Sequence, residues 1–304
     1  MNNLERVCEK YDLNIRKYEE KNRIKIIDTD KGKFVLKKNS PTEEHLYEYL
    51  NNKHFDYLID KEMIDNYDIF PYIDEISIPK DEKGVELVNV LSLLHNKTTF
   101  YRKVVLDDTK KLYEELNNKI DNLYHYYYDL QDIIEQKVYM APEEYLLIRN
   151  VSLIYSALNY SKEKLDEWYK LKSKQTKERV VLLHGRPSLE HFLVDNKKQL
   201  ISWDKCKRDI PIYDFIYFYK TDYLDLEMSS LFDFYQSKFF YSNDEYLLFL
   251  VLISLPDKIK FSRHHIKDCT ETYKLIKYVS KTRDFILKEN EKYQEENKNE
   301  FEEE

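Results

Sequence analysis

The sequence predicts an α+β protein in two parts, a small strand-rich N-terminal part and a larger helical part. Polar and apolar residues alternate over 23–29, and after a turn at 30–33 a second strand follows at 34–37, which is the pattern of a β-hairpin. Between residues 106 and 172, apolar residues recur every three or four positions, as in amphipathic helices. A chain of 304 residues is long enough for two separate cores.

The remaining N-terminal elements follow from local signals. Residues 1–12 are predicted to form a short helix with Leu4, Val7 and Cys8 on one face. A second helix is expected over 40–52, because Ser40 can cap it, proline suits the first helical position and Glu43 completes a capping box. Residues 54–74 complete this part.

Several helices are expected in the second part. The run 86–95 has helical periodicity, and His95 at its end is expected to be a buried packing histidine. A long helix is predicted over 106–140 and another over 143–172. Because Pro142 separates them, an antiparallel pair within the chain is favoured over a coiled-coil surface for a partner. Further helices are predicted at 213–220, 226–241, 245–255 and 270–287.

Two segments have unusual composition. The tyrosines at 124 and 126–128 either pack at the core margin, which we favour, or line a cleft for a sugar or amine. Residues 289–304 are almost all Glu, Lys, Asn and Gln, so we expect a frayed helix or a disordered tail.

Composition excludes several classes of function. The net charge of −8 argues against nucleic-acid binding, and no apolar run approaches the length of about 20 residues that a membrane span needs. The three cysteines are scattered, which is typical of free thiols in a reducing cytosol, so a cytoplasmic location is expected.

The stretch 180–220 is the most informative. Val180–Leu183 reads as a buried strand that His184-Gly185-Arg186-Pro187 interrupts. Two short apolar runs, 191–194 and 199–203, flank a polar turn and predict a hairpin. A helical run then begins near Asp214.

This layout resembles the catalytic segment of the aminoglycoside phosphotransferase and choline kinase-like family, and more narrowly its spore-coat-associated branch in Gram-positive spore formers. The family pattern is His-Gly-Asp, four residues, Asn, a hairpin ending Ile-Asp-Trp-Glu, then Pro-x-x-Asp. The residues that match its structural positions are His184, Gly185, Trp203 and Asp214. The resemblance implies a protein kinase-like two-lobed fold, with an N-lobe over 1–75 and a helical C-lobe over 76–288 that carries a helical-hairpin insertion and a catalytic-loop-like segment at 180–214.

The three reactive positions of the family differ here. Arg186 replaces the general-base Asp, His191 the metal-binding Asn and Ser202 the metal-binding Asp. Phosphoryl transfer needs a carboxylate to orient the acceptor and oxygen ligands to hold magnesium. A guanidinium is permanently protonated, and imidazole is a poor magnesium ligand.

The resemblance also implies nucleotide-pocket positions. Lys37 falls on the strand lysine that contacts nucleotide, in the form Gly-x-Phe-x-Leu-Lys. Glu44 is the first choice for its helical glutamate partner, with Glu48 as second choice. Tyr72 and Ile73 fall near the hinge between lobes.

Three functional hypotheses follow. The first is a kinase-fold pseudoenzyme that binds or assembles with a protein partner of unknown identity, in the cytoplasm or in a spore and its coat, without cofactor or metal. The second is an active phosphotransferase using ATP and magnesium, in which Asp204 or Asp209 holds the metal and Glu190 acts as base. The third is a non-reacting anion-binding module in which Arg186 and Lys37 clamp a phosphate. Alternatively, Arg186 forms a salt bridge with Glu190 or Asp204.

Overall fold

The computed structural model describes residues 14–21, 24–38, 41–64 and 67–302. It divides into two compact units, one of Met1–Val90 with His184–Lys207 and one of Leu91–Leu183 with Arg208–Glu304. The predicted lobe boundary after residue 75 stays a prediction. The expected helix over 1–12 and the capping residue Ser40 lie outside the described residues.

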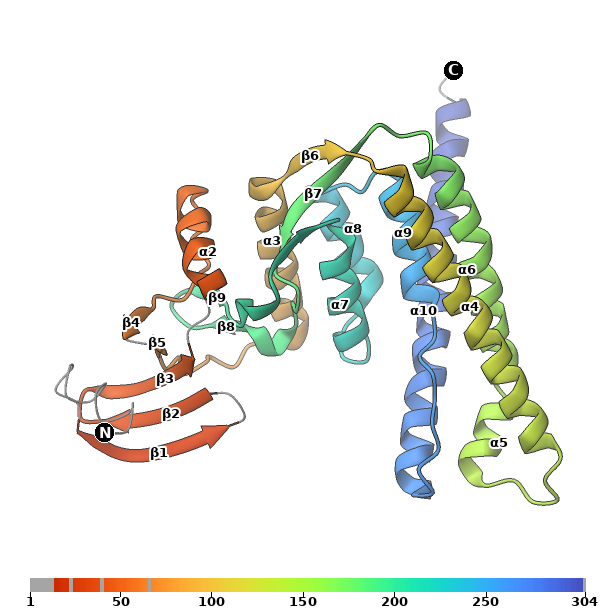
Figure 1. Cartoon of the computed structure of the whole chain (residues 1–304), viewed down its shortest axis with the longest axis horizontal. Helices are drawn as coiled ribbons and strands as arrows, with labels where there is room; N and C mark the ends of the chain where they lie inside the picture. The colour runs from red at the N-terminus through yellow and green to blue at the C-terminus, as the bar shows by residue number, and fades with distance from the viewer. Residues whose placement is uncertain (1–13, 22–23, 39–40, 65–66, 303–304) are drawn as a thin grey trace. The chain divides into compact units, whose positions relative to one another are not determined.

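A five-stranded antiparallel sheet forms much of the first unit, with the strand order β1-β2-β3-β5-β4 (Figure 1). Its strands are β1 (Ile15–Lys21), β2 (Ile24–Thr29), β3 (Gly32–Lys38), β4 (Glu62–Ile64) and β5 (Tyr67–Pro71). The predicted hairpin is β2–β3, in which Thr29 pairs with Gly32 at the turn. Ile27, Leu36 and Ile69 are buried together, because alternate residues of neighbouring strands share one face of the sheet.

The segment from His184 to Lys207 joins the same unit through backbone hydrogen bonds. It contains the 3-10 helices η1 (Leu189–His191) and η2 (Trp203–Lys205) and the predicted hairpin, β8 (Phe192–Val194) with β9 (Lys198–Leu200). Leu200 N donates to Tyr57 O at 2.8 Å, and Ile76 N donates to Val194 O at 2.9 Å. The unit also contains α2 (Pro41–Asn52) and the beginning of α3 (Lys80–Thr98).

The second unit is mainly helical. Its helices after α3 are α4 (Leu106–Glu135), α5 (Pro142–Ile148), α6 (Val151–Lys172), α7 (Ile212–Asp222), α8 (Met228–Lys238), α9 (Asn243–Ser254) and α10 (His265–Glu302). The strands β6 (Phe100–Lys103), β7 (Lys177–Leu183) and β10 (Lys207–Asp209) form a small sheet in the order β10-β7-β6. Residues 180–183 of β7 are buried, as the sequence predicts.

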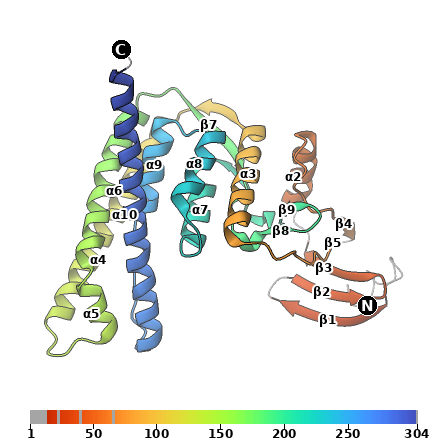
Figure 2. The same ribbon diagram turned by 180° about the vertical axis from the view of Figure 1, so that it is seen from behind.

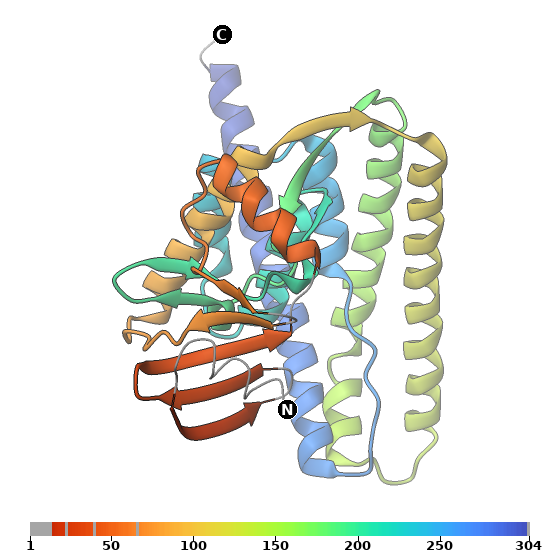
Figure 3. The same ribbon diagram turned by 60° about the vertical axis from the view of Figure 1, so that its left-hand side comes forward.

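The predicted antiparallel helix pair is present as α4 and α6 (Figure 3). Helix α10 packs on α6 and α9 (Figure 2) and continues to Glu302, so it includes most of the Glu- and Lys-rich segment. Among the described residues, no helix has an apolar stretch long enough to cross a membrane.

Two helix predictions were wrong in their limits. The helix expected over 106–140 ends at Glu135, and the single helix expected over 143–172 is two helices, α5 and α6. The second break lies at Asn150, whose side-chain amide donates to Leu146 O at 2.9 Å while its backbone N–H bonds Leu147 O. An asparagine side chain can thus replace a helical backbone bond, which lets the chain turn.

Tyrosines fill much of the second unit's core. Tyr127 is fully buried and donates to the carbonyl of Asp257, whereas Tyr124 and Tyr128 are exposed. Tyr126 is partly buried and donates to the carbonyl of Ile259. These contacts support the packing role that the sequence favours for Tyr126 and Tyr127.

Candidate functional site

The loop after β7 depends on a glycine. Gly185 has φ of +87°, and a Cβ atom there would lie 2.2 Å from the carbonyl oxygen of Lys205. Next to it, His184 is fully buried, its Nε2 donates to Ile201 O at 2.8 Å, and its ring meets the Trp203 indole edge-on at 4.7 Å. The residues that match the family's structural positions here therefore fix the shape of the loop.

His191 closes the same loop from its other end. Its Nδ1 donates to Arg186 O at 2.7 Å and lies 3.2 Å from Ser188 Oγ. This hydrogen bond links His191 to Arg186, and both residues occupy reactive positions of the resembled family. It contributes to loop structure in a place where that family has a metal ligand.

The Asp204 carboxylate lies between two cations. Lys37 Nζ is 3.9 Å from Asp204 Oδ1, and Arg186 Nη1 is 3.7 Å from Asp204 Oδ2. The side chains of Lys37, Arg186 and Asp204 are 23%, 38% and 26% exposed, so solvent and a ligand can reach them. Of the two salt-bridge partners expected for Arg186, Asp204 is the one that pairs with it in the structure. Glu190, the other, is exposed.

Ser202 has a left-handed backbone, with φ of 67° and ψ of 52°. This region is uncommon for residues other than glycine, and Asn and Asp enter it more readily than serine does. The backbone at this position therefore suits the aspartate that the resembled family has there, although the side chain is now an alcohol.

A cavity of about 370 Å³ lies within the first unit beside these residues. Its size falls in the range of about 300–1,000 Å³ that is usual for small-molecule sites. Apolar side chains of β2, β3, β5 and β8 form much of its wall, and the polar groups lie at Lys37, Tyr47, Asp74, Glu75 and Ser202. The wall therefore combines a mainly apolar surface with a few polar groups.

The structure brings most of the predicted pocket residues together. Lys37, Tyr72 and Ile73 all line this cavity, with Ser202 and Trp203. Glu44 is in α2, but its side chain lies outside the described part of the molecule, and Glu48 is exposed. The roles assigned to these residues stay predictions.

Tyr47 of α2 also lines the cavity, and the sequence reasoning missed it. It lies three residues after Glu44, so the two positions are neighbours on the helix surface. That spacing is the signal by which Tyr47 could have been found.

In the second unit, Asp214 is fully buried and bonds a histidine. His95 Nε2 donates to Asp214 Oδ2 at 3.1 Å, and Tyr235 Oη lies 2.6 Å from His95 Nδ1. His95 is buried, as predicted. The structural role that the resemblance implies for Asp214 stays a prediction.

The side chains at the three reactive positions do not fit a magnesium ion. They supply a guanidinium, an imidazole engaged with Arg186 O and an alcohol, and the adjacent Asp204 faces two cations. Magnesium is held by carboxylate and water oxygens in octahedral geometry. Within the described residues, no three His, Cys, Asp or Glu side chains gather in a way that could hold a metal.

Comparison with known proteins identifies the fold. No family model matches the sequence, and no curated protein matches it. Among solved structures, an aminoglycoside phosphotransferase from Alicyclobacillus acidocaldarius superposes with a TM-score of 0.68 at 12% identity, covering 94% of this chain and 95% of the other. An AMP-bound spectinomycin phosphotransferase superposes with a TM-score of 0.56 at 12% identity, covering 91% of this chain and 97% of the other.

A glucosamine kinase in complex with glucosamine, ADP and inorganic phosphate superposes with a TM-score of 0.50 at 10% identity, covering 94% of this chain and 83% of the other. Identities this low show the fold alone. The chain has the two-lobed, α+β protein kinase-like fold of these small-molecule phosphotransferases, which confirms the predicted fold class.

Proposed function

We propose that this protein is a kinase-fold pseudoenzyme, which acts as a binding or assembly protein and does not transfer phosphoryl groups. The observation that supports the proposal best is the pairing of Asp204 with both Lys37 and Arg186. Phosphoryl transfer requires carboxylates gathered around magnesium and a base for the acceptor. Here the carboxylate next to the altered loop offsets two fixed positive charges instead.

The alternative of an active enzyme with a rearranged site has less support. Asp204 would have to leave two cations in order to bind a metal. Asp209 Oδ1 accepts a hydrogen bond from Ile210 N at 2.9 Å, and Glu190 is exposed. An active site built on Asp204 would therefore first have to separate it from Lys37 and Arg186.

The proposed partner is a protein, and the proposed location is a spore or its coat in addition to the cytoplasm. Both rest on the resemblance of the 184–214 segment to the spore-coat-associated branch. The retained loop supports a binding role, because Gly185 and His184 preserve a defined surface where the catalytic groups have been lost.

A turnover assay tests the proposal. The wild-type protein, given labelled ATP, magnesium and a panel of aminoglycosides, amino sugars and choline, is expected to transfer no phosphate above the rate without protein. Turnover that disappears in both Lys37→Ala and Glu190→Gln would contradict the proposal and establish the rearranged site. Turnover that survives in both variants would point to a contaminating kinase, and a repurified sample should then show none.

Metal-independent anion binding is a second candidate, favoured by the two accessible cations at one carboxylate. Lys37 and Arg186 both lie within 4 Å of Asp204. An entering phosphate or carboxylate can therefore share both cations with Asp204, and the Arg186 guanidinium can bind it in a bidentate manner.

Calorimetric titration of pyrophosphate into the protein tests anion binding, with EDTA present to remove metal ions. Arg186→Ala should weaken binding by at least about tenfold, which corresponds to one lost charged hydrogen bond. Arg102→Ala, which removes an exposed arginine of β6 that pairs with Glu178, is the matched control and should leave the affinity unchanged. Equal affinities for Arg186→Ala and wild type would remove the candidate.

A further inference from the structure

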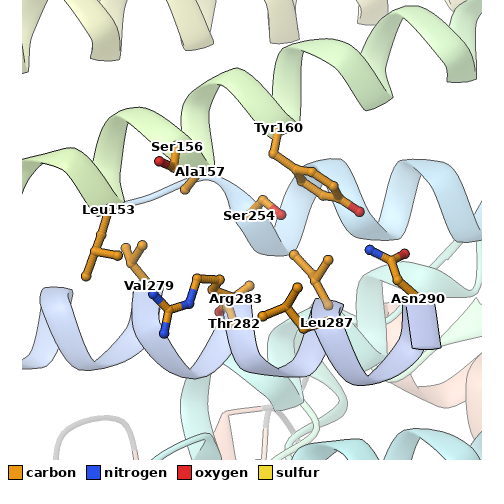
Figure 4. A pocket seen from close by; sticks show the side chains of 11 residues that line it. Leu153, Ser156, Ala157, Tyr160, Ser254, Val279, Thr282, Arg283, Leu287 and Asn290 are labelled. Carbon is orange, nitrogen blue, oxygen red and sulfur yellow. The ribbon is translucent and has the colours of Figure 1, made fainter. Parts of the chain in front are cut away.

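A second cavity, of about 240 Å³, lies inside the helical unit between α6, the end of α9 and α10 (Figure 4). Most of its wall is apolar. The apolar lining residues are Leu153, Ala157, Val279, Ile286 and Leu287. Its residues belong to the second unit alone, whereas the cavity beside Lys37 belongs to the first.

The hydroxyl of Ser254 in this cavity is buried without a hydrogen-bond partner. Ser254 is only 3% exposed. Several serines and threonines in these helices donate to the carbonyl four residues earlier, as Ser156 and Ser161 of α6 do at 2.9 Å. The Ser254 hydroxyl does not use this bond, and Figure 4 shows it in the space between α6 and α10.

The hydroxyl of Tyr160, on α6, is likewise buried and unpartnered. Several buried tyrosines of the unit do find partners, for example Tyr278, whose Oη donates to Ile253 O at 2.5 Å, whereas the hydroxyl of Tyr241, outside this cavity, does not. Burial raises the pKa of Tyr160 well above its ordinary value, so its hydroxyl stays protonated and able to donate. Figure 4 shows the Tyr160 ring extending from α6 into the same space as Ser254.

Two unpartnered hydroxyls in one cavity need an explanation, because buried polar groups in native proteins nearly always have a partner. Water could bond one or both hydroxyls. Apart from Ser156, Thr282, Arg283 and Asn290, however, the remaining wall is apolar, so such a water would face mostly aliphatic side chains. The volume is also large for water alone, since an apolar cavity of about 150 Å³ already accepts benzene. An amphiphile would fill the apolar space and form hydrogen bonds with both hydroxyls.

We propose that this cavity is a binding site for a small, uncharged amphiphile with an apolar body, about the size of a substituted phenol, and one hydroxyl or carbonyl oxygen. The apolar body lies among the aliphatic side chains of α6 and α10. Its oxygen bonds the hydroxyls of Tyr160 and Ser254.

The entrance and its charges agree with an uncharged ligand. Leu287, Arg283 and Asn290 are exposed, so they form the solvent side of the cavity. The Arg283 guanidinium already bonds Asp284 at 3.0 Å, and Figure 4 shows it extending away from Tyr160. No cation therefore faces the buried hydroxyls among the labelled lining residues.

The test compares 4-ethylphenol with ethylbenzene, which has the same apolar body without the hydroxyl, by calorimetric titration of the full-length protein. Wild type is expected to bind 4-ethylphenol at least about tenfold more tightly than ethylbenzene, because only the phenol satisfies the buried hydroxyls. In Tyr160→Phe/Ser254→Ala this preference should fall to about twofold or less, with ethylbenzene affinity unchanged or higher. Ala157→Leu, which narrows the cavity, should weaken both ligands.

Thermal unfolding of the ligand-free variants keeps the test decisive. If the hydroxyls are unpartnered, Ser254→Ala should unfold at the wild-type temperature or above it, since it removes a buried polar group that has no bond to lose. A lower unfolding temperature, together with no measurable binding of either ligand, would show that ordered water fills the site and would overturn the proposal. Equal affinities of wild type and the double variant for 4-ethylphenol would overturn it as well.

Discussion

At the scale of single residues, the loop after β7 has the glycine and histidine of the resembled phosphotransferase motif, but different side chains at its three reactive positions. Gly185 and Ser202 both have positive φ, and His184 bonds Ile201 across the loop. Within the resembled motif, the three reactive positions are occupied by Arg186, His191 and Ser202. The loop geometry is therefore compatible with this fold, whereas the side chains at these three positions include no carboxylate.

Gly185→Ala should destabilise the protein more than Gly32→Ala does. Both glycines have positive φ, for which a strained residue costs about 1–3 kcal/mol. Only at Gly185 would the new Cβ also meet backbone, 2.2 Å from Lys205 O, whereas at Gly32 no atom lies within 4 Å. Urea unfolding should show the larger loss of unfolding free energy for Gly185→Ala. Equal losses would mean that the loop can open without cost.

The sequence reveals the altered residues but not their new partners. Arg186, His191 and Ser202 are recognisable because they occupy fixed spacings from His184 and Trp203. The bond from His191 to Arg186 O depends on how the loop closes, which no spacing encodes. The approach of Lys37 to Asp204 joins residues far apart in the chain.

At the scale of elements, a buried ion network joins α6, β7 and α9. Lys172 Nζ lies 3.0 Å from Asp244 and 3.1 Å from Glu178. Burial acts to raise the pKa of Asp244, but the hydrogen bond from Gln175 and the charge of Lys172 outweigh it, so this pKa lies below its ordinary value. The network therefore connects α6 and α9 to strand β7 of the small sheet.

Asp244→Asn should lower the free energy of unfolding by about 1–3 kcal/mol near pH 7, the usual value of a charged hydrogen bond. Because the folded pKa is lowered, this contribution is complete above the ordinary aspartate pKa of about 3.9 and is lost as pH falls through the folded value. Urea unfolding at pH 7, 5 and 3 should show that the difference in unfolding free energy between variant and wild type becomes smaller only at pH 3.

Asp233→Asn is the control, since Asp233 is 49% exposed where it pairs with Lys292. Its effect should stay within about 1 kcal/mol at every pH, as for other surface pairs. A loss for Asp244→Asn that did not change with pH would show that the variant acts through packing and not through charge.

Strongly periodic elements were the easiest to predict. The hairpin β2–β3 and the pair α4 and α6 follow from residue patterns. The break between α5 and α6 was missed because Asn150 ends a helix through a side-chain bond and not through proline or glycine. The short strands β6 and β10 also escaped prediction, since three or four residues carry too little periodicity.

At the scale of the whole molecule, the fold and the chemistry are separable. Solved phosphotransferases share the fold at 12% identity, and the cavity lined by Lys37, Tyr72 and Ser202 has the size of a small-molecule site. Such a fold can persist while many surface residues change, because substitutions away from the core usually alter stability by less than about 0.5 kcal/mol. The architecture is therefore compatible with Arg186, His191 and Ser202 at these three positions, none of which supplies a carboxylate.

The most direct test is the magnesium dependence of ATP affinity. ATP should be titrated calorimetrically into the full-length protein, once with magnesium and once with EDTA. Because Arg186, His191 and Ser202 supply no carboxylate for the metal, the account predicts that magnesium leaves ATP binding unchanged or weakens it by screening the phosphates. Binding that tightens tenfold or more with magnesium, and is lost in Asp204→Asn, would contradict it.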